Sequence, residues 1–174
     1  MNNFTLDTPM QEVETRYPFA KALLHANFHV GGCASCGYEG HQSIGEVAKM
    51  HEKDAEAMVT DLNNGLKQMF ESELSPVQVK DIVEKKKVLL IDVREDWERD
   101  LVSLEGAIPL SQDTFPKIIE DSKEVDYTVV YCHHGVRSLN ATLYLKQNGL
   151  ENVFSMAGGI EEYAKTVDTN LQRY

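Results

Sequence analysis

The sequence predicts two parts: a small all-helical region, followed by an α/β domain whose parallel sheet is flanked by helices. Two observations indicate this division. Between Pro9 and about Phe70 the apolar residues follow helical spacing, without strand-like alternation. After Pro76, short apolar runs alternate with helical segments, which is typical of a parallel sheet covered by helices. We therefore expect domains at residues 1–71 and 72–174.

Start signals locate the helices of the first region. Pro9 and Pro18 each follow a residue suited to precede a helix, and the segment from Ser43 to Glu46 has the form of a capping box. The segment Asn63-Asn64-Gly65 is typical of a turn and is expected near the end of the region. The clearest apolar stripe at helical spacing consists of Ala55, Met58, Val59, Leu62 and Leu66.

The second region opens with Ser75 as a helix cap and Pro76 at the first helical position. Strands are predicted at residues 88–93, 127–132 and 152–156, and helices near residues 77–85, 95–101, 114–121 and 138–148.

The composition favours a soluble globular protein, with 42% hydrophobic and 26% charged residues. A net charge of -11 disfavours nucleic-acid binding through a broad basic face. The aliphatic run at residues 88–91 is far shorter than the ~20 residues that a spanning helix needs. The first residues lack the features of a secretory signal. We therefore expect a cytoplasmic protein with neither a membrane nor a nucleic-acid partner.

The segment that begins at Cys132 has the pattern of a reactive loop. Cys132 ends the most β-prone run, and a helix is expected to begin near Ser138. Inward-facing N–H groups and a helix N-terminus stabilise an anion, so we expect Cys132 to be largely a thiolate. Arg137 adds a permanent positive charge that binds an anionic donor or braces the loop. Gly135 supplies a backbone angle that other residues resist.

Residues 75–174 resemble a rhodanese domain. The resemblance rests on four segments: IDVREDWE at 91–98, EGAIPL at 105–110, VVYCHHGVRS at 129–138 and MAGGIEEYA at 156–164. It implies that Cys132 takes a sulfane sulfur from a small anionic donor, holds it as a persulfide and passes it to a thiol or other nucleophilic acceptor. Neither a metal nor a cofactor is expected to take part.

The resemblance also implies roles for the neighbours of Cys132. The persulfide is expected to lie among the loop amides, with Ser138 in a supporting role. Asp92 and Arg94 either support the loop or form a structural ion pair, and both alternatives remain open. The residues expected to bind the substrate are His133, His134, Gly135, Val136 and Arg137.

The two histidines admit several interpretations: His133 and His134 tune Cys132, bind an anionic donor when protonated, or merely occupy exposed positions.

The length of the loop distinguishes sulfur transfer from phosphate hydrolysis. Four residues separate Cys132 from Arg137, whereas the related phosphatases and arsenate reductases use a loop one residue longer for a tetrahedral oxyanion. A smaller loop favours sulfur transfer over phosphate hydrolysis.

Two departures from the rhodanese pattern bear on the shape of the substrate pocket. The segment 104–110 lacks the usual histidine before its glycine and is shorter than the common pattern. Tyr163 stands where a tryptophan is usual.

The helical region contains a C-x-x-C motif, Cys33 to Cys36, with three open interpretations. The pair forms a redox dithiol, or it binds zinc with His25 and His29, which lie four residues apart, or it simply packs. Residues 5–64 resemble a redox-disulfide domain associated with hybrid-cluster proteins, which implies a dithiol. Such a dithiol would accept sulfur from Cys132 in a relay between the domains.

The sequence therefore predicts a rhodanese-type sulfurtransferase with Cys132 as nucleophile. A second hypothesis is a binding or sensing protein that is persulfidated once without turnover, and a third is a zinc-stabilised scaffold. The physiological donor and acceptor and the oligomeric state remain open.

Overall fold

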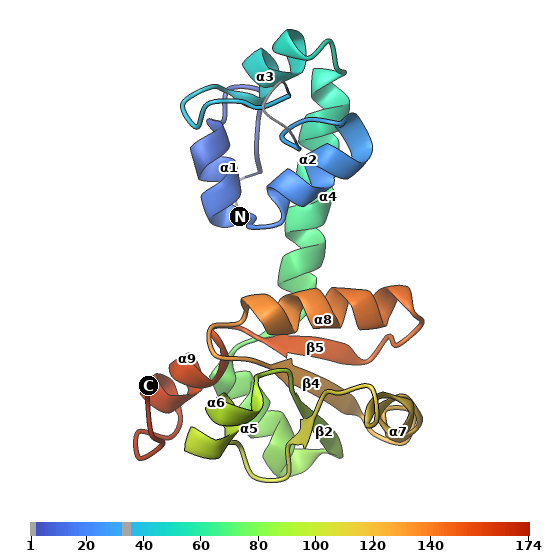
Figure 1. Cartoon of the computed structure of the whole chain (residues 1–174), viewed down its shortest axis with the longest axis vertical. Helices are drawn as coiled ribbons and strands as arrows, with labels where there is room; N and C mark the ends of the chain where they lie inside the picture. Colours follow the sequence, from blue (N-terminus) through green and yellow to red (C-terminus); the bar gives the residue numbers. More distant parts are fainter. Residues whose placement is uncertain (1–2, 33–35) are drawn as a thin grey trace. The chain divides into compact units, whose positions relative to one another are not determined.

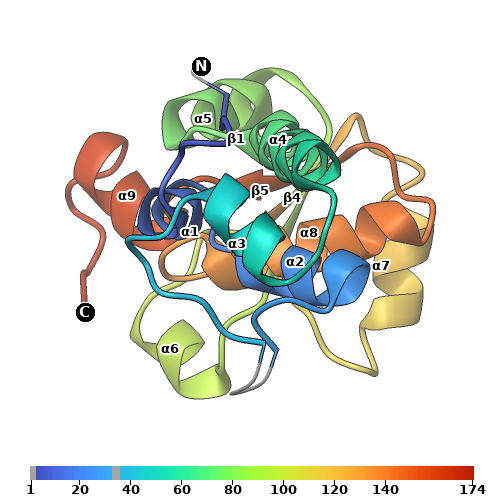
Figure 2. The same ribbon diagram turned by 90° about the horizontal axis from the view of Figure 1, so that it is seen from above.

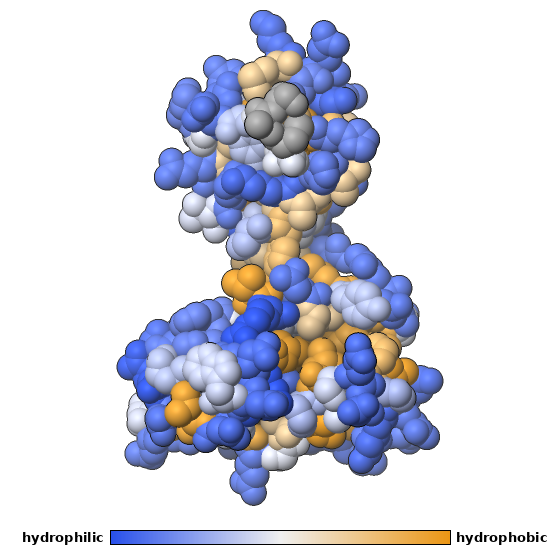
Figure 3. Space-filling view, viewed as in Figure 1, coloured by the Kyte–Doolittle hydropathy of each residue, from blue (hydrophilic) through white to orange (hydrophobic). Residues whose placement is uncertain are grey.

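A computed structural model of the chain divides into two compact units, Met1–Glu71 and Ser72–Tyr174 (Figure 1). The structure describes residues 3–32 and 36–174. Hydrophilic side chains cover much of each unit on the face seen in Figure 3. Across the described ranges, no helix combines the length and apolar character needed to cross a membrane.

The described part of the first unit is built from helices joined by loops. A buried apolar core forms between its helices, as the helical spacing of the apolar residues predicts. The capping box at Ser43 is confirmed: the Ser43 hydroxyl accepts a hydrogen bond from the Glu46 amide, and the Glu46 carboxylate accepts one from the Ser43 amide. The helices are α1 (Met10–Arg16), α2 (Ala20–Phe28), α3 (Ile44–Met50) and α4 (Ala55–Glu71).

The turn expected at residues 63–65 is wrong, because α4 runs straight through it. The Asn63 side chain accepts a hydrogen bond from the Phe4 amide at 2.8 Å and donates one to the Phe4 carbonyl at 3.0 Å. A Cβ atom at Gly65 would lie 2.6 Å from the Tyr17 hydroxyl. In this helix the asparagine therefore fixes the N-terminal segment, and the glycine makes room for a tyrosine ring.

The second unit is built on a parallel sheet, which confirms the predicted α/β class. Its strand order is β1-β5-β4-β2-β3. The two outer strands contain only two residues each, which is too short for a periodicity signal, and the sequence did not indicate them. The strands are β1 (Glu73–Leu74), β2 (Val88–Asp92), β3 (Ile108–Pro109), β4 (Tyr127–Tyr131) and β5 (Val153–Met156).

Helices cover both faces of this sheet (Figures 1 and 2). The helix that begins at Pro76 carries the predicted Ser75 capping box. Apolar residues that alternate along β2 and β4 pack with α7 and α8 on one face and with α5 and α9 on the other. The helices are α5 (Pro76–Lys85), α6 (Asp96–Leu101), α7 (Phe115–Asp121), α8 (Val136–Gln147) and α9 (Gly159–Thr166).

The register of the central strands determines where the reactive loop lies. In the pairing of β2 with β4, Asp92 is opposite Tyr131. The chain that leaves β2 and the chain that leaves β4 therefore emerge side by side at the carboxyl edge of the sheet, where α/β proteins commonly place their sites.

Candidate active site

Cys132 follows the last residue of β4 directly and is 1% exposed. The Gly135 amide donates a hydrogen bond to the Cys132 sulfur at 3.1 Å. The Ser138 hydroxyl lies 3.5 Å from the same sulfur and 2.9 Å from the hydroxyl of Ser155 on β5. The sulfur is thus held between the loop and the first turn of α8, which begins at Val136, slightly earlier than the sequence indicated.

Gly135 has the backbone angle that the sequence predicts for it. Its φ is +93°, in the left-handed region that side chains disfavour. A Cβ atom there would also lie 2.9 Å from the Gly158 amide nitrogen. Both restrictions require glycine where the loop turns into α8.

The N-terminus of α9 fixes the backbone of the loop from the other side. The Ile160 amide donates to the Cys132 carbonyl at 2.9 Å, and the Glu161 amide donates to the His133 carbonyl at 3.1 Å. A Cβ atom on Gly159 would lie 2.3 Å from each of these carbonyl oxygens. The double glycine of the segment 156–164 therefore permits a close approach that holds the sulfur-bearing residue in place.

Asp92 and Arg94 form an ion pair whose side chains are 1% and 0% exposed. The Arg94 guanidinium lies 2.7 Å from the Asp92 carboxylate and donates to the Val102 carbonyl at 2.7 Å. Burial opposes the charge of Arg94, but hydrogen bonds with Asp92 and Tyr174 outweigh it and raise the pKa of Arg94. These contacts tie the end of β2 to the end of α6 and favour the structural interpretation of the pair.

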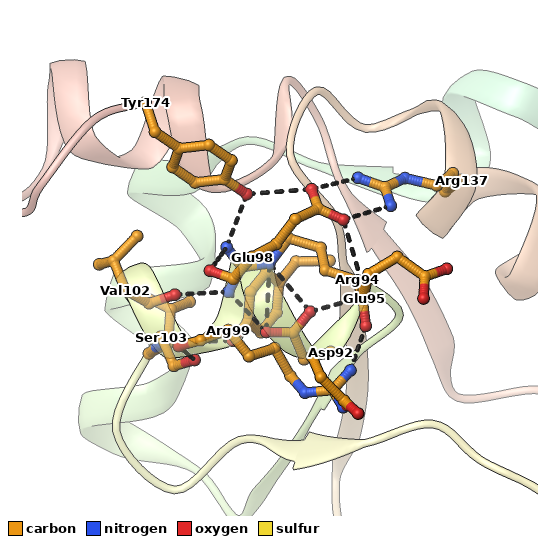
Figure 4. A network of polar contacts seen from close by, with 12 residues as sticks. Asp92, Arg94, Glu95, Glu98, Arg99, Val102, Ser103, Arg137 and Tyr174 are labelled. Carbon is orange, nitrogen blue, oxygen red and sulfur yellow. Dashed lines mark hydrogen bonds and ion pairs between the residues drawn. The ribbon is translucent and has the colours of Figure 1, made fainter.

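Arg137 pairs with Glu98 on α6, a residue that sequence reasoning did not single out (Figure 4). Two parallel hydrogen bonds of 2.6 Å join the guanidinium to the two carboxylate oxygens. These bonds lower the pKa of Glu98 to about 2 and raise the pKa of Arg137. The Glu98 side chain is 4% exposed and that of Arg137 is 45% exposed. Arg137 is therefore braced from one side and open to solvent on another.

His133 and His134 differ in exposure although they are neighbours. Their rings stack with centroids 3.8 Å apart. His134 is exposed, whereas His133 is half-buried. Burial lowers the pKa of His133, and the nearby His134 lowers it further. The structure thus favours the neutral form of His133 beside Cys132.

Residues of both departures from the rhodanese pattern line one pocket. Tyr163, Leu104 and Glu105 line a pocket of about 340 Å³ together with Val79 of α5 and residues of the segment after α9. The segment 104–110 supplies the short edge strand β3.

The C-x-x-C motif lies partly outside the described residues, since Cys33 does. Cys36 is half-buried. His25 lies in the last turn of α2, whereas His29 follows the helix as its C-cap with a φ of +56°. Within the part of the chain that the structure describes, no group of three or more His, Cys, Asp or Glu side chains is arranged to hold a metal ion.

Comparison with protein families identifies the second unit. The model of the rhodanese-like domain matches residues 75–166, more than half of the chain. The chain belongs to the rhodanese-like family. The match begins at the cap of α5, ends at the last residue of α9 and contains the whole of the Cys132 loop.

Named relatives share this rhodanese-like part. A tRNA uridine(34) hydroxylase of Photorhabdus laumondii is 32% identical over 99 residues, which cover 53% of this chain and 28% of that protein. The corresponding protein of Escherichia fergusonii is 35% identical over 98 residues, which cover 53% of this chain and 28% of that protein. The match therefore spans less than a third of these relatives.

A solved structure shares the fold. The reduced Bacillus anthracis CoADR-RHD aligns with a TM-score of 0.52 and 21% identity, covering 70% of this chain and 21% of that chain. At this level of identity the likeness concerns the rhodanese fold alone.

Proposed function

We propose that the rhodanese-like domain moves sulfane sulfur from a small anionic donor, such as thiosulfate, to a thiol acceptor through a persulfide on Cys132. One observation carries the proposal: the Cys132 sulfur accepts a hydrogen bond from the Gly135 amide at the start of α8. An N–H group and a helix N-terminus aimed at sulfur stabilise a thiolate and, after reaction, a persulfide anion.

In the first half-reaction the Cys132 thiolate attacks the outer sulfur of thiosulfate. The S–S bond of the donor breaks, and sulfite leaves with the bonding electron pair. Arg137 is the cation that meets the anionic donor, because its side chain is braced by Glu98 and still 45% exposed.

In the second half-reaction an acceptor thiolate attacks the terminal sulfur of the persulfide. The Cys132–sulfur bond breaks, and Cys132 departs as the thiolate with the bonding pair. The first N–H groups of a helix have no partner within the helix. The amides of Val136 and Arg137, at the first positions of α8, are thus suited to hold the terminal sulfur between the two steps.

Neither half-reaction needs a proton transfer once the thiolate has formed, so the mechanism requires no catalytic base. The pKa of His133 is lowered, which favours the neutral ring. A neutral ring does not compete with Arg137 for the anionic donor. The chemistry also requires no cofactor.

Steady-state turnover with thiosulfate and an acceptor thiol tests the proposal. The wild-type protein is expected to produce sulfite continuously, and Cys132→Ser is expected to produce none. Ser103→Ala, a substitution outside the loop, is the matched control and should turn over normally. A single equivalent of sulfite followed by no further product would support the sensing hypothesis and contradict the enzymatic one.

For the helical unit we propose a dithiol that accepts sulfur from Cys132. One cysteine of the pair Cys33 and Cys36 attacks the persulfide and becomes persulfidated. Its partner then attacks it, forms the disulfide and releases hydrosulfide, after which an external thiol must reduce the disulfide. The spacing and the resemblance of residues 5–64 support this step. If Cys33→Ser and Cys36→Ser leave hydrosulfide release unchanged, the relay does not operate.

The relatives are named as tRNA uridine(34) hydroxylases, and the match covers only 28% of those proteins. A net charge of -11 does not favour a broad RNA-binding surface. The site itself therefore supports sulfur transfer to a small thiol better than action on tRNA.

A further inference from the structure

The segment that follows α9, residues 167–174, lies outside the family match and packs onto the Cys132 site. Leu171 packs against the apolar cluster beneath α9. The Arg173 guanidinium pairs with Glu161 at 2.6 Å. These two contacts lead the chain to Tyr174, whose side chain enters the polar network of the site (Figure 4).

The hydroxyl of Tyr174 joins the two arginine–carboxylate pairs. It accepts a hydrogen bond from Arg94 at 2.9 Å and donates one to Glu98 at 3.0 Å. The same Glu98 oxygen accepts a hydrogen bond from Arg137, and the other oxygen accepts from Arg137 and from the Glu95 amide. These four hydrogen bonds fix the orientation of the Glu98 carboxylate. The carboxylate in turn fixes the orientation of the Arg137 guanidinium.

The ring of Tyr174 contacts the loop directly. It stacks on His133 with centroids 4.2 Å apart and an interplanar angle of 23°. The His134 ring stacks on the His133 ring with centroids 3.8 Å apart. Trp97, which is exposed, meets Tyr174 edge-on. The imidazole next to Cys132 is therefore stacked against both His134 and Tyr174.

We propose that Tyr174 is a positioning residue for sulfur transfer, whose hydroxyl orients Arg137 through Glu98 and whose ring keeps His133 covered. The proposal rests on the proposed function of Cys132 and deepens it. Arg137 presents its charge to an anionic donor in one fixed direction only while Glu98 is held, and the tyrosine hydroxyl is one of the groups that hold it.

Several charged groups face His133 and influence its pKa in opposite directions. Glu161 of α9 lies 3.9 Å away, and it and Glu98 of α6 favour the protonated imidazole. His134 and Arg94 oppose protonation. Burial is the largest influence and lowers the pKa of His133. Removing the ring should therefore raise this pKa, whereas removing only the hydroxyl should leave the ring in place.

Two variants separate these contributions, with Tyr144→Phe, an exposed tyrosine on α8, as the matched control. Tyr174→Phe is expected to raise the thiosulfate concentration for half-maximal rate by about tenfold, as for the loss of one hydrogen bond to a charged group, with kcat unchanged. Tyr174→Ala should raise this concentration at least as much, because it removes the same hydroxyl together with the ring. A purely structural role would instead lower the active fraction, and so kcat, in both variants.

Titration of the His133 ring by NMR gives a readout that does not depend on activity. The ring pKa should rise in Tyr174→Ala and stay near that of the wild type in Tyr174→Phe. Unchanged titration in Tyr174→Ala, or kinetics of Tyr174→Phe within about twofold of the wild type, overturns the proposal. If instead the wild-type protein forms no sulfite, the proposed function itself fails, and the titration still decides whether Tyr174 covers His133.

Discussion

Two arginine–carboxylate pairs lie side by side at the carboxyl edge of the sheet, and they differ in exposure. The side chains of Arg94 and Asp92 are 0% and 1% exposed, whereas Arg137 is 45% exposed and its partner Glu98 only 4%. Both members of the first pair are therefore removed from water, whereas the arginine of the second pair is in contact with it. Burial, rather than residue type, separates a fold-supporting arginine from one that is available to a substrate.

The difference has an electrostatic cause. A charge taken out of water needs a full set of hydrogen-bond partners, and Arg94 finds them in Asp92, the Glu98 and Val102 carbonyls and Tyr174. Such a cation has no capacity left for a ligand. Arg137 has a buried partner on one side and solvent on the other, so an anion can approach it.

The largest expected effect is on stability. Arg94→Met leaves the buried Asp92 carboxylate without its cation and should lower the free energy of unfolding by about 3–5 kcal/mol. Urea denaturation followed by circular dichroism measures it. The double variant with Asp92→Asn should cost less than the sum of the two single variants, because they share one interaction. A loss below about 1 kcal/mol for Arg94→Met would remove the distinction between the pairs.

The second effect is on activity. Arg137→Met should raise the half-saturating thiosulfate concentration at least about tenfold, because the donor loses its cation. Its cost in stability should be about 1–3 kcal/mol, below that of Arg94→Met, since Glu98 still accepts from Tyr174 and the Glu95 amide. Donor kinetics and urea denaturation of the same preparation provide both numbers. Equal stability losses in the two arginine variants would contradict the comparison.

Local patterns in the sequence indicated both residues of the Asp92–Arg94 pair but only Arg137 of the second pair. Asp92 ends β2, Arg94 follows it closely, and Arg137 lies in the first turn of α8, so local patterns could predict their places. Glu98 lies within the segment 91–98 and offered a signal, because it follows a strand end by a few residues.

Contacts between distant segments could not be predicted in this way. Tyr174 meets Glu98 across 76 residues of chain, and periodicity carries no information on such a pairing. The same limit applies to Ser155, which meets Ser138 from another strand. Asn63 and Gly65 show the opposite failure: a strong local turn signal yields to burial of one face of α4.

A third prediction concerns acid. Because Arg137 lowers the pKa of Glu98 to about 2, the folded protein binds a proton there less readily than the unfolded chain. The stability from this pair is therefore fully present above the ordinary pKa of a glutamate and is lost as the pH falls toward about 2. Glu98→Gln should remove this part of the pH dependence, as measured by urea denaturation at a series of pH values. An unchanged pH dependence in that variant would show that Glu98 is not held by Arg137.

The smallest expected effect is that of salt. Raising the ionic strength should weaken donor binding by about two- to threefold, because Arg137 is half-exposed and its charge is screened. The Arg94 pair is buried, so salt should leave its contribution to stability unchanged. Donor kinetics at several potassium chloride concentrations measure the first effect. Urea denaturation of the wild type and of the double variant of Arg94 and Asp92 at the same concentrations measures the second. Salt-independent donor kinetics would mean that Arg137 does not meet the anion.

The most direct test of the account is the intact mass of the protein after treatment with thiosulfate under non-reducing conditions. The wild-type chain and Cys33→Ser/Cys36→Ser should each gain one sulfur atom, and Cys132→Ser should gain none. A chain that gains no sulfur, or a gain that persists in Cys132→Ser, would contradict the assignment of Cys132 as the sulfur carrier.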